Sequence, residues 1–146
     1  MLRATYRLQL HDGLGFDAVA RLAPWLGAIG VSHDPQTGRI FVASQGSDNV
    51  IVLDGKDGRV IADTPTGAGA LNVVFDPVKR RAYVSNRGAS TIAVVDADGK
   101  LLANLGPAPL ANHVSLGKDG TVFAVDKSAS VDGDEGDTVL RIRPKK

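Results

Sequence analysis

Three kinds of side chain in this 146-residue sequence could do chemistry: histidines, a run of carboxylates, and clustered arginines and lysines. The histidines, His11, His33 and His113, lie far apart and show no metal-ligand spacing such as His-x-x-x-His. The chain has no cysteine, which excludes disulfides, thiolate metal sites and cysteine nucleophiles. It also lacks a G-x-S-x-G elbow and any recognisable nucleophile–base pair. The sequence therefore predicts no enzyme, no cofactor and no metal site.

The run of carboxylates is the next candidate. Asp132, Asp134, Glu135 and Asp137 alternate with glycines, so four carboxylates stand within six residues. Carboxylate oxygens are good ligands for Ca²⁺. The segment lacks the twelve-residue EF-hand pattern, because no glutamate stands at its twelfth position. We interpret residues 132–137 as a solvated hairpin loop, and calcium binding stays an open alternative.

Basic residues gather in two short stretches, which are Lys79 to Arg81 with Arg87 nearby, and Arg141 to Lys146. Such patches contact phosphates in nucleic-acid-binding proteins. The whole chain, however, has 17 basic and 16 acidic side chains and a net charge of +1. This balance argues against a broad nucleic-acid or membrane surface driven by charge. We therefore expect neither as a partner, and keep a DNA-binding fragment as an alternative.

An internal repeat organises most of the chain. A similar sequence recurs after 42 positions: Asp34-Pro35 through Phe41-Val42-Ala43-Ser44 corresponds to Asp76-Pro77 through Tyr83-Val84-Ser85-Asn86. The same 42 positions separate Asp54 from Asp96. A third copy begins at Val114, and an insertion over residues 128–137 precedes its final strand at 138–142. Such a period indicates a repeat architecture.

Each repeat reads as four short strands joined by turns. In the second copy the strands are expected over 72–75, 82–85, 91–95 and 100–105, because these stretches are apolar and rich in β-branched residues. Asp-Pro, Asn-Arg-Gly and Asp-Gly turns separate them. Four antiparallel strands in 40–45 residues are typical of a β-propeller blade. We predict a mostly β, partial β-propeller of about three four-stranded blades, over 31–70, 71–111 and 112–146.

The first thirty residues have a different pattern. Thr5 to Leu10 alternates apolar and polar side chains, which predicts a strand. A helix is expected next, because apolar residues recur at spacings of three and four. They are Phe16, Val19, Leu22, Leu26 and Ile29. Pro24 should kink this helix, and Gly27 and Gly30 should end it. Residues 1–30 are therefore predicted to form a strand–helix segment.

The repeat register also selects three candidate ligand-contacting residues. Asn72, Asn112 and His113 stand at the starts of the expected innermost strands. Such positions line the mouth of a propeller channel, where polar side chains contact ligands. The competing interpretation is that these side chains satisfy backbone groups of the adjoining turns. We carry all three forward as candidate ligand-contacting residues.

The repeat text resembles a known family. Asp34-Pro35-x-Thr37-Gly38-Arg39-Ile40-Phe41-Val42, Gly46-Ser47-Asp48-Asn49-Val50 and Tyr83-Val84-Ser85-Asn86-Arg87-Gly88 are similar to YVTN-type β-propeller repeats. These are the WD40-like repeats of the YncE-like proteins. The resemblance covers residues 31–146. It implies a binding scaffold, usually exported and built of about seven blades, with at least one member linked to DNA binding.

A second resemblance covers residues 4–33. Ala4-Thr5-Tyr6-Arg7-Leu8-Gln9-Leu10, Leu22-Ala23-Pro24-Trp25-Leu26 and Gly30-Val31-Ser32-His33 are similar to the opening of maltooligosyl trehalose synthase. That family has an α-amylase-like TIM barrel, whose catalytic carboxylates lie on later strands. The resemblance implies no catalytic residue here. It implies that the chain is a fragment, or a chimera joined where the two sequences are briefly similar.

Together these patterns predict a non-enzymatic module that offers a binding or scaffold surface. The alternatives are a glucan-isomerase fragment without catalytic residues and the DNA-binding fragment. Three blades leave unpaired edge strands, so we expect self-association, for example two copies closing a six-bladed ring. No apolar run of about 18 residues and no secretory signal is present, which predicts a cytoplasmic protein. The resembled propeller family, in contrast, is usually exported or periplasmic.

Overall fold

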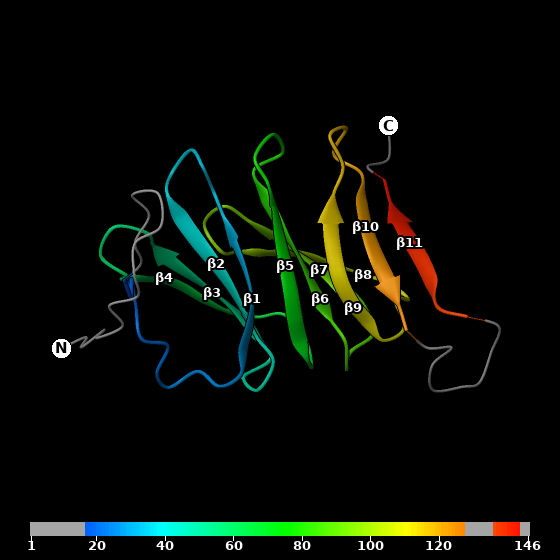
Figure 1. Cartoon of the computed structure of the whole chain (residues 1–146), viewed down its shortest axis with the longest axis horizontal. Coiled ribbons are helices and arrows are strands. Elements are labelled where there is room, and N and C mark those ends of the chain that lie inside the picture. The colour runs from blue at the N-terminus through cyan, green and yellow to red at the C-terminus, as the bar shows by residue number, and fades with distance from the viewer. Residues whose placement is uncertain (1–16, 128–135, 144–146) are drawn as a thin grey trace, which may run out of the picture.

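The computed structural model describes residues 17–127 and 136–143, and these form eleven β-strands and no helix (Figure 1). The strands make three antiparallel sheets in which chain neighbours pair. Sheet 1 contains β1 (Ala28–His33), β2 (Arg39–Ser44), β3 (Asn49–Asp54) and β4 (Val60–Pro65). Sheet 2 contains β5 (Ala70–Asp76), β6 (Arg81–Asn86), β7 (Thr91–Asp96) and β8 (Leu101–Leu105). Sheet 3 contains β9 (Ala111–Leu116), β10 (Val122–Asp126) and β11 (Thr138–Ile142).

The first hairpin of each sheet is built in the same way. Its turn contains one residue in the left-handed region, Gly38 (φ 74°), Arg80 (φ 56°) or Gly120 (φ 80°). The strands on either side pair in matching register, since Phe41 opposes Ser32, Tyr83 opposes Val74 and Phe123 opposes Ser115. The three hairpins are therefore structural equivalents, and residues can be compared position by position.

The sheets stand next to one another through their first strands, β1, β5 and β9 (Figure 1). Side-chain hydrogen bonds tie these strands together. The Phe75 N–H donates to Ser32 Oγ at 3.0 Å, and the Val114 N–H donates to Asn72 Oδ1 at 3.2 Å. Gly30 permits the close approach, because a Cβ there would lie 2.7 Å from Asn72 Cα.

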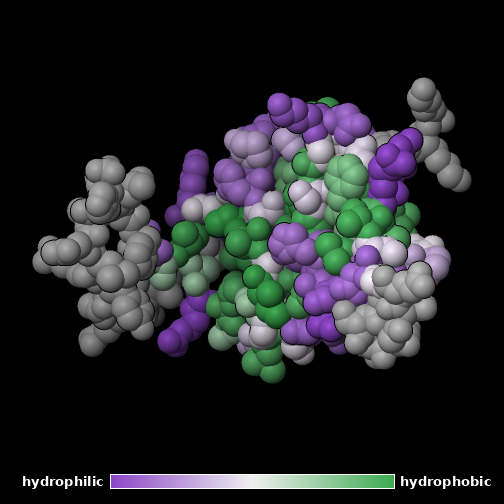
Figure 2. All heavy atoms as spheres, turned by 45° about the vertical axis from the view of Figure 1, so that its right-hand side comes forward, coloured by the Kyte–Doolittle hydropathy of each residue, from purple (hydrophilic) through white to green (hydrophobic). Residues whose placement is uncertain are grey.

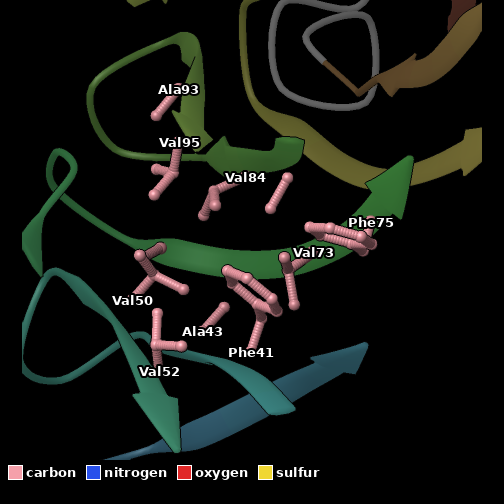
Figure 3. Packing of buried hydrophobic residues seen from close by; sticks show 11 residues of the cluster. Phe41, Ala43, Val50, Val52, Val73, Phe75, Val84, Ala93 and Val95 are labelled. Carbon is pink, nitrogen blue, oxygen red and sulfur yellow. The ribbon is translucent and has the colours of Figure 1, made fainter. Parts of the chain in front are cut away.

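The core lies in the two interfaces between neighbouring sheets, which we call the first seam (sheets 1 and 2) and the second seam (sheets 2 and 3). In the first seam, side chains of sheet 1 face sheet 2, and the rings of Phe41 and Phe75 stack with centroids 5.0 Å apart (Figure 3). Val50, Val52, Val84 and Val95 complete this contact. In the second seam, Tyr83, Ile92 and Val94 of sheet 2 pack against Val114, Val122 and Ala124 of sheet 3. Alternate side chains of sheet 2 thus serve opposite neighbours, as a strand period of two requires.

The strand–helix expectation for the N-terminus is corrected in its helical part. Residues 17–27 form no helix, and Ala20, Leu22 and Trp25 of this segment lie on the outer face of sheet 1. Leu22 and Trp25 pack there against Ile51 and its neighbours. Pro24 cannot donate a helical hydrogen bond. The carbonyls of Leu26 and Gly27 instead accept from the N–H groups of Gly46 and Gln45. The expected strand at Thr5 to Leu10 lies outside the described residues.

The third blade also differs from the expectation of four strands. Within the described residues sheet 3 has three strands, and β11 is its edge. The insertion after Lys127 separates β10 from β11. Of the acidic run, only Gly136 and Asp137 are described, and the tail from Pro144 onward is not. The calcium alternative therefore stays a prediction.

Candidate functional site

The structure places the three predicted ligand candidates along the first strands of sheets 2 and 3. Asn72 is half-buried and its Oδ1 accepts the Val114 N–H, so this side chain joins the sheets. Ser85 Oγ donates to the backbone carbonyl of Asn112 at 3.2 Å and lies 3.5 Å from that of Asn72. His113 is exposed on β9. Asn72 and Asn112 are thus brought together, and ligand contact by the three residues stays a prediction.

A hollow lies at the outer end of the second seam. It is a groove of about 630 Å³ between the outer strands of sheet 2 and β11. This volume is typical of ligand sites in proteins. Its lining is mainly apolar on the side of sheet 2: Tyr83, Ile92, Val94, Leu102, Ala103 and Leu105. Figure 2 brings the β11 side of the molecule forward and shows apolar side chains exposed between polar regions.

The groove follows the edge of β11. Leu140, Arg141, Ile142 and Arg143 all line it, although successive side chains of a strand point to opposite faces. Four consecutive lining residues therefore mark the strand edge, which among the described residues pairs with no further strand. In sheets 1 and 2 the equivalent edges, of β3 and β7, are occupied by β4 and β8.

Three arginines, Arg81, Arg141 and Arg143, border the groove, and no carboxylate among the described residues lines it. Arg141 opposes Phe123, and Arg141 and Arg143 also line a second hollow beside Phe123 and Asp119, on the face of sheet 3 turned away from sheet 2. The Arg81 guanidinium lies over the Tyr83 ring, 5.8 Å from its centroid. Burial raises the pKa of the Tyr83 hydroxyl, so the ring stays neutral at physiological pH. Among the described residues Arg81 Nε is buried without a hydrogen-bond partner.

Sequence reasoning identified the basic stretch and the final strand but not the groove between them. Arg81 and Arg141 stand 60 positions apart, and only the packing of sheet 3 on sheet 2 brings them together. A signal was available, because the third repeat offers three strand-like stretches where the others offer four. Within the described residues no group of three or more His, Asp or Glu side chains is arranged to hold a metal ion.

Comparison with solved structures supports the propeller architecture. The chain is similar to hydrazine synthase of Kuenenia stuttgartiensis, with a TM-score of 0.69 and 21% identity over 77% of this chain and 33% of that one. Streptogramin B lyase matches with a TM-score of 0.60 and 15% identity over 84% and 42%. The dihydro-heme d1 dehydrogenase NirN matches with 0.59 and 16% over 77% and 25%.

These three neighbours are β-propeller-type proteins of varied function, so the likeness shows a propeller-like fold and nothing more. The chain spans between 25% and 42% of their lengths. No protein-family model and no curated protein matches the sequence. Neither the YVTN-type nor the trehalose synthase resemblance therefore gains support from a family match. In the part of the chain that is described, no helix is long and apolar enough to cross a membrane.

Proposed function

We propose that this chain is a non-enzymatic binding module of the β-propeller type, and that its groove receives an extended polypeptide segment from a partner. The edge of β11 beside an apolar wall carries this proposal. An unpaired strand edge offers backbone donors and acceptors to an added strand. The added strand would run antiparallel to β11, as β4 does to β3 and β8 does to β7.

Charge and shape define the partner segment. Arg81 beside Tyr83 favours a carboxylate in the partner segment, because guanidinium and carboxylate groups form paired hydrogen bonds. The wall formed by Ile92, Leu102 and Leu105 favours apolar side chains on the inward face. A segment that alternates apolar and polar residues and carries at least one acidic residue meets both demands.

The finer sequence interpretations enter here as proposals. We assign residues 31–146 to the YVTN-type repeats because the residues of the repeats are similar to that family. Nothing in the groove or the comparisons favours the glucan-isomerase or DNA-binding alternatives. Closure of a ring by two copies also stays a proposal. It would need the outer face of sheet 1, where Leu22 and Trp25 now lie.

The test is a binding titration with a strand-forming probe. The peptide of residues 60–65, Val-Ile-Ala-Asp-Thr-Pro, forms β4 of sheet 1 and combines apolar residues with one carboxylate. Labelled with fluorescein, it should bind the purified chain saturably in a fluorescence anisotropy titration. The same peptide methylated on its backbone nitrogens should bind at least about tenfold more weakly, because it cannot donate to the β11 edge.

A matched pair of variants locates the binding. Leu102 lines the groove and is 51% exposed, whereas Val31 is 67% exposed on β1 and lies outside it. Leu102→Arg should weaken binding about tenfold by placing a charge on the apolar wall. Val31→Arg should leave it unchanged. Absence of saturable binding, or equal effects of the two variants, would refute the proposal.

A further inference from the structure

The first seam contains a buried ion pair between neighbouring sheets. The carboxylate of Asp34, which is 0% exposed, accepts hydrogen bonds from both terminal nitrogens of Arg80. It also accepts from the Gln36 N–H and from the Thr37 hydroxyl. The Arg80 guanidinium lies over the Phe75 ring, 5.1 Å from its centroid. Every oxygen of the Asp34 carboxylate is thus satisfied, with a cation supplied by the next sheet.

The second seam has the same carboxylate without the cation. Asp76 is the repeat equivalent of Asp34 and is 2% exposed. Its Oδ1 accepts the N–H groups of Val78 and Lys79, as an Asp in a turn does. Its Oδ2 is buried and has no hydrogen-bond partner among the residues that the structure describes. A buried carboxylate oxygen without a partner is costly and calls for an explanation.

Two changes in the repeat explain why Asp76 Oδ2 has no partner. The position of Arg80 is taken by Gly120 in the next hairpin, and both residues have left-handed backbone. The position of the Thr37 hydroxyl donor is taken by Lys79. A Cβ built on Gly120 would lie 3.5 Å from Asp76 Oδ2. The space where an arginine side chain would lie therefore adjoins the unpartnered oxygen.

That space is a real pocket. It measures about 330 Å³ and is lined by the two hairpin turns, Asp76 to Lys79 and Leu116 to Gly120. Leu116 occupies the position of Phe75, so an apolar surface remains where Arg80 rests on a ring in the first seam. The pocket thus combines a buried acceptor with an apolar wall.

We propose that this Asp76 pocket binds a guanidinium group presented from outside, such as the side chain of an arginine in a partner or a small guanidinium compound. The first seam supplies the precedent within the same molecule. A planar guanidinium can donate two hydrogen bonds to one carboxylate and rest its face on apolar or aromatic surface. An ammonium group lacks that planar face and is more strongly hydrated.

The other charges around the pocket are compatible with this ligand. Lys79 and Lys118 line it together with Asp119, so the lining has two basic and two acidic side chains with Asp76 included. Lys79 Nζ lies 3.1 Å from the Cβ position on Gly120. This amine is the far end of a flexible side chain and can move aside. Replacing Lys79 by Met should therefore strengthen guanidinium binding by removing a competing cation.

The test uses agmatine as the probe, in calorimetric titrations of the full chain. Agmatine and N-acetyl-arginine amide should bind with one-to-one stoichiometry. N-acetyl-citrulline amide, which has the same shape without the charge, should bind at least about tenfold more weakly. N-acetyl-lysine amide tests the ammonium group, and binding equal to that of the arginine compound would overturn the assignment to guanidinium.

Asp76→Asn is the deciding variant, because asparagine retains the Oδ1 acceptor for the turn and changes only the second oxygen. It should fold and lose agmatine binding about tenfold or more. Gly120→Arg should also abolish the binding by filling the pocket from within. Unchanged binding in both variants, or no binding to the parent chain, would overturn the proposal. The groove experiment above uses a different surface, so either result leaves the other interpretable.

Discussion

The two seams of this molecule use the same repeat but are completed differently. In the first, Asp34 meets Arg80 of the next sheet and Phe41 stacks on Phe75. In the second, Asp76 faces Gly120, and a pocket takes the place of the arginine. The Asp34 carboxylate of the first seam is satisfied within the chain. Within the described residues the second seam has an unpartnered buried oxygen at Asp76 and, further out, an apolar groove beside the edge of β11, which pairs with no further strand.

This difference shows how a repeat can acquire a site without new architecture. The hairpin backbone is retained, including its left-handed residue, while side chains that close the first seam are absent from the second. A buried carboxylate that has lost its internal cation can accept a cation of similar shape from outside.

Truncating the aromatic pair should damage the first seam most. Phe41 is fully buried against Phe75, so Phe41→Ala should lower the free energy of unfolding by about 4 kcal/mol, through lost transfer energy and a cavity. Phe123 is its repeat equivalent and is 38% exposed on sheet 3. Phe123→Ala should cost about 1 kcal/mol. Urea unfolding of both variants checks this, and equal losses would contradict the burial of Phe41 between sheets 1 and 2.

Removing the internal cation should make the first seam resemble the second. Arg80→Gly leaves the buried Asp34 carboxylate without its partner and should lower the free energy of unfolding by about 3 kcal/mol. Glycine suits the left-handed backbone at this position, so the loss reports the ion pair together with the contact of the guanidinium with the Phe75 ring, and not backbone strain. Agmatine should restore part of the stability in a thermal unfolding experiment. A variant as stable as the parent, or one that agmatine leaves unchanged, would contradict the equivalence of the two sites.

Acid should weaken the first seam, which is stable at neutral pH. The Arg80 guanidinium holds the pKa of Asp34 well below its usual range. Because the folded-state pKa is depressed, the stabilisation is present above the unfolded value of about 4 and is lost as pH falls below it. Unfolding free energies measured from pH 6 to pH 2 should fall more steeply for the parent than for Asp34→Asn. Parallel curves would remove Asp34 as the cause.

Completing the second seam from within should change stability least. Gly120→Arg supplies a cation for Asp76 but places a side chain at φ 80°, which costs about 1 kcal/mol. The two effects oppose each other, so we expect a net change within about 1 kcal/mol of the parent. Thermal unfolding in the presence of agmatine separates them, since the variant should no longer respond to it. A response equal to that of the parent would place the ligand elsewhere.

Sequence patterns predicted most of the fold but little of the site. The 42-residue period located the strands of sheets 1 and 2, because alternating β-branched residues and Asp-Pro turns act locally. The helix expected from Val19, Leu22 and Leu26 is absent, since Pro24 and the face of sheet 1 favour an extended path. The sequence does contain a signal for the Asp76 pocket, since Gly120 stands at the repeat position of Arg80. The signal can be interpreted only when it is known that each hairpin contacts the next.

The occupancy of the two carboxylates can be followed individually during a titration. The full chain, labelled with carboxyl-¹³C aspartate, is titrated with agmatine while the resonances of Asp34 and Asp76 are recorded by NMR and assigned with the Asn variants. We predict a saturable shift of the Asp76 resonance and no change at Asp34, which Arg80 already occupies. No shift at Asp76, or equal shifts at both residues, would contradict the claim that one seam is closed and the other is a binding site.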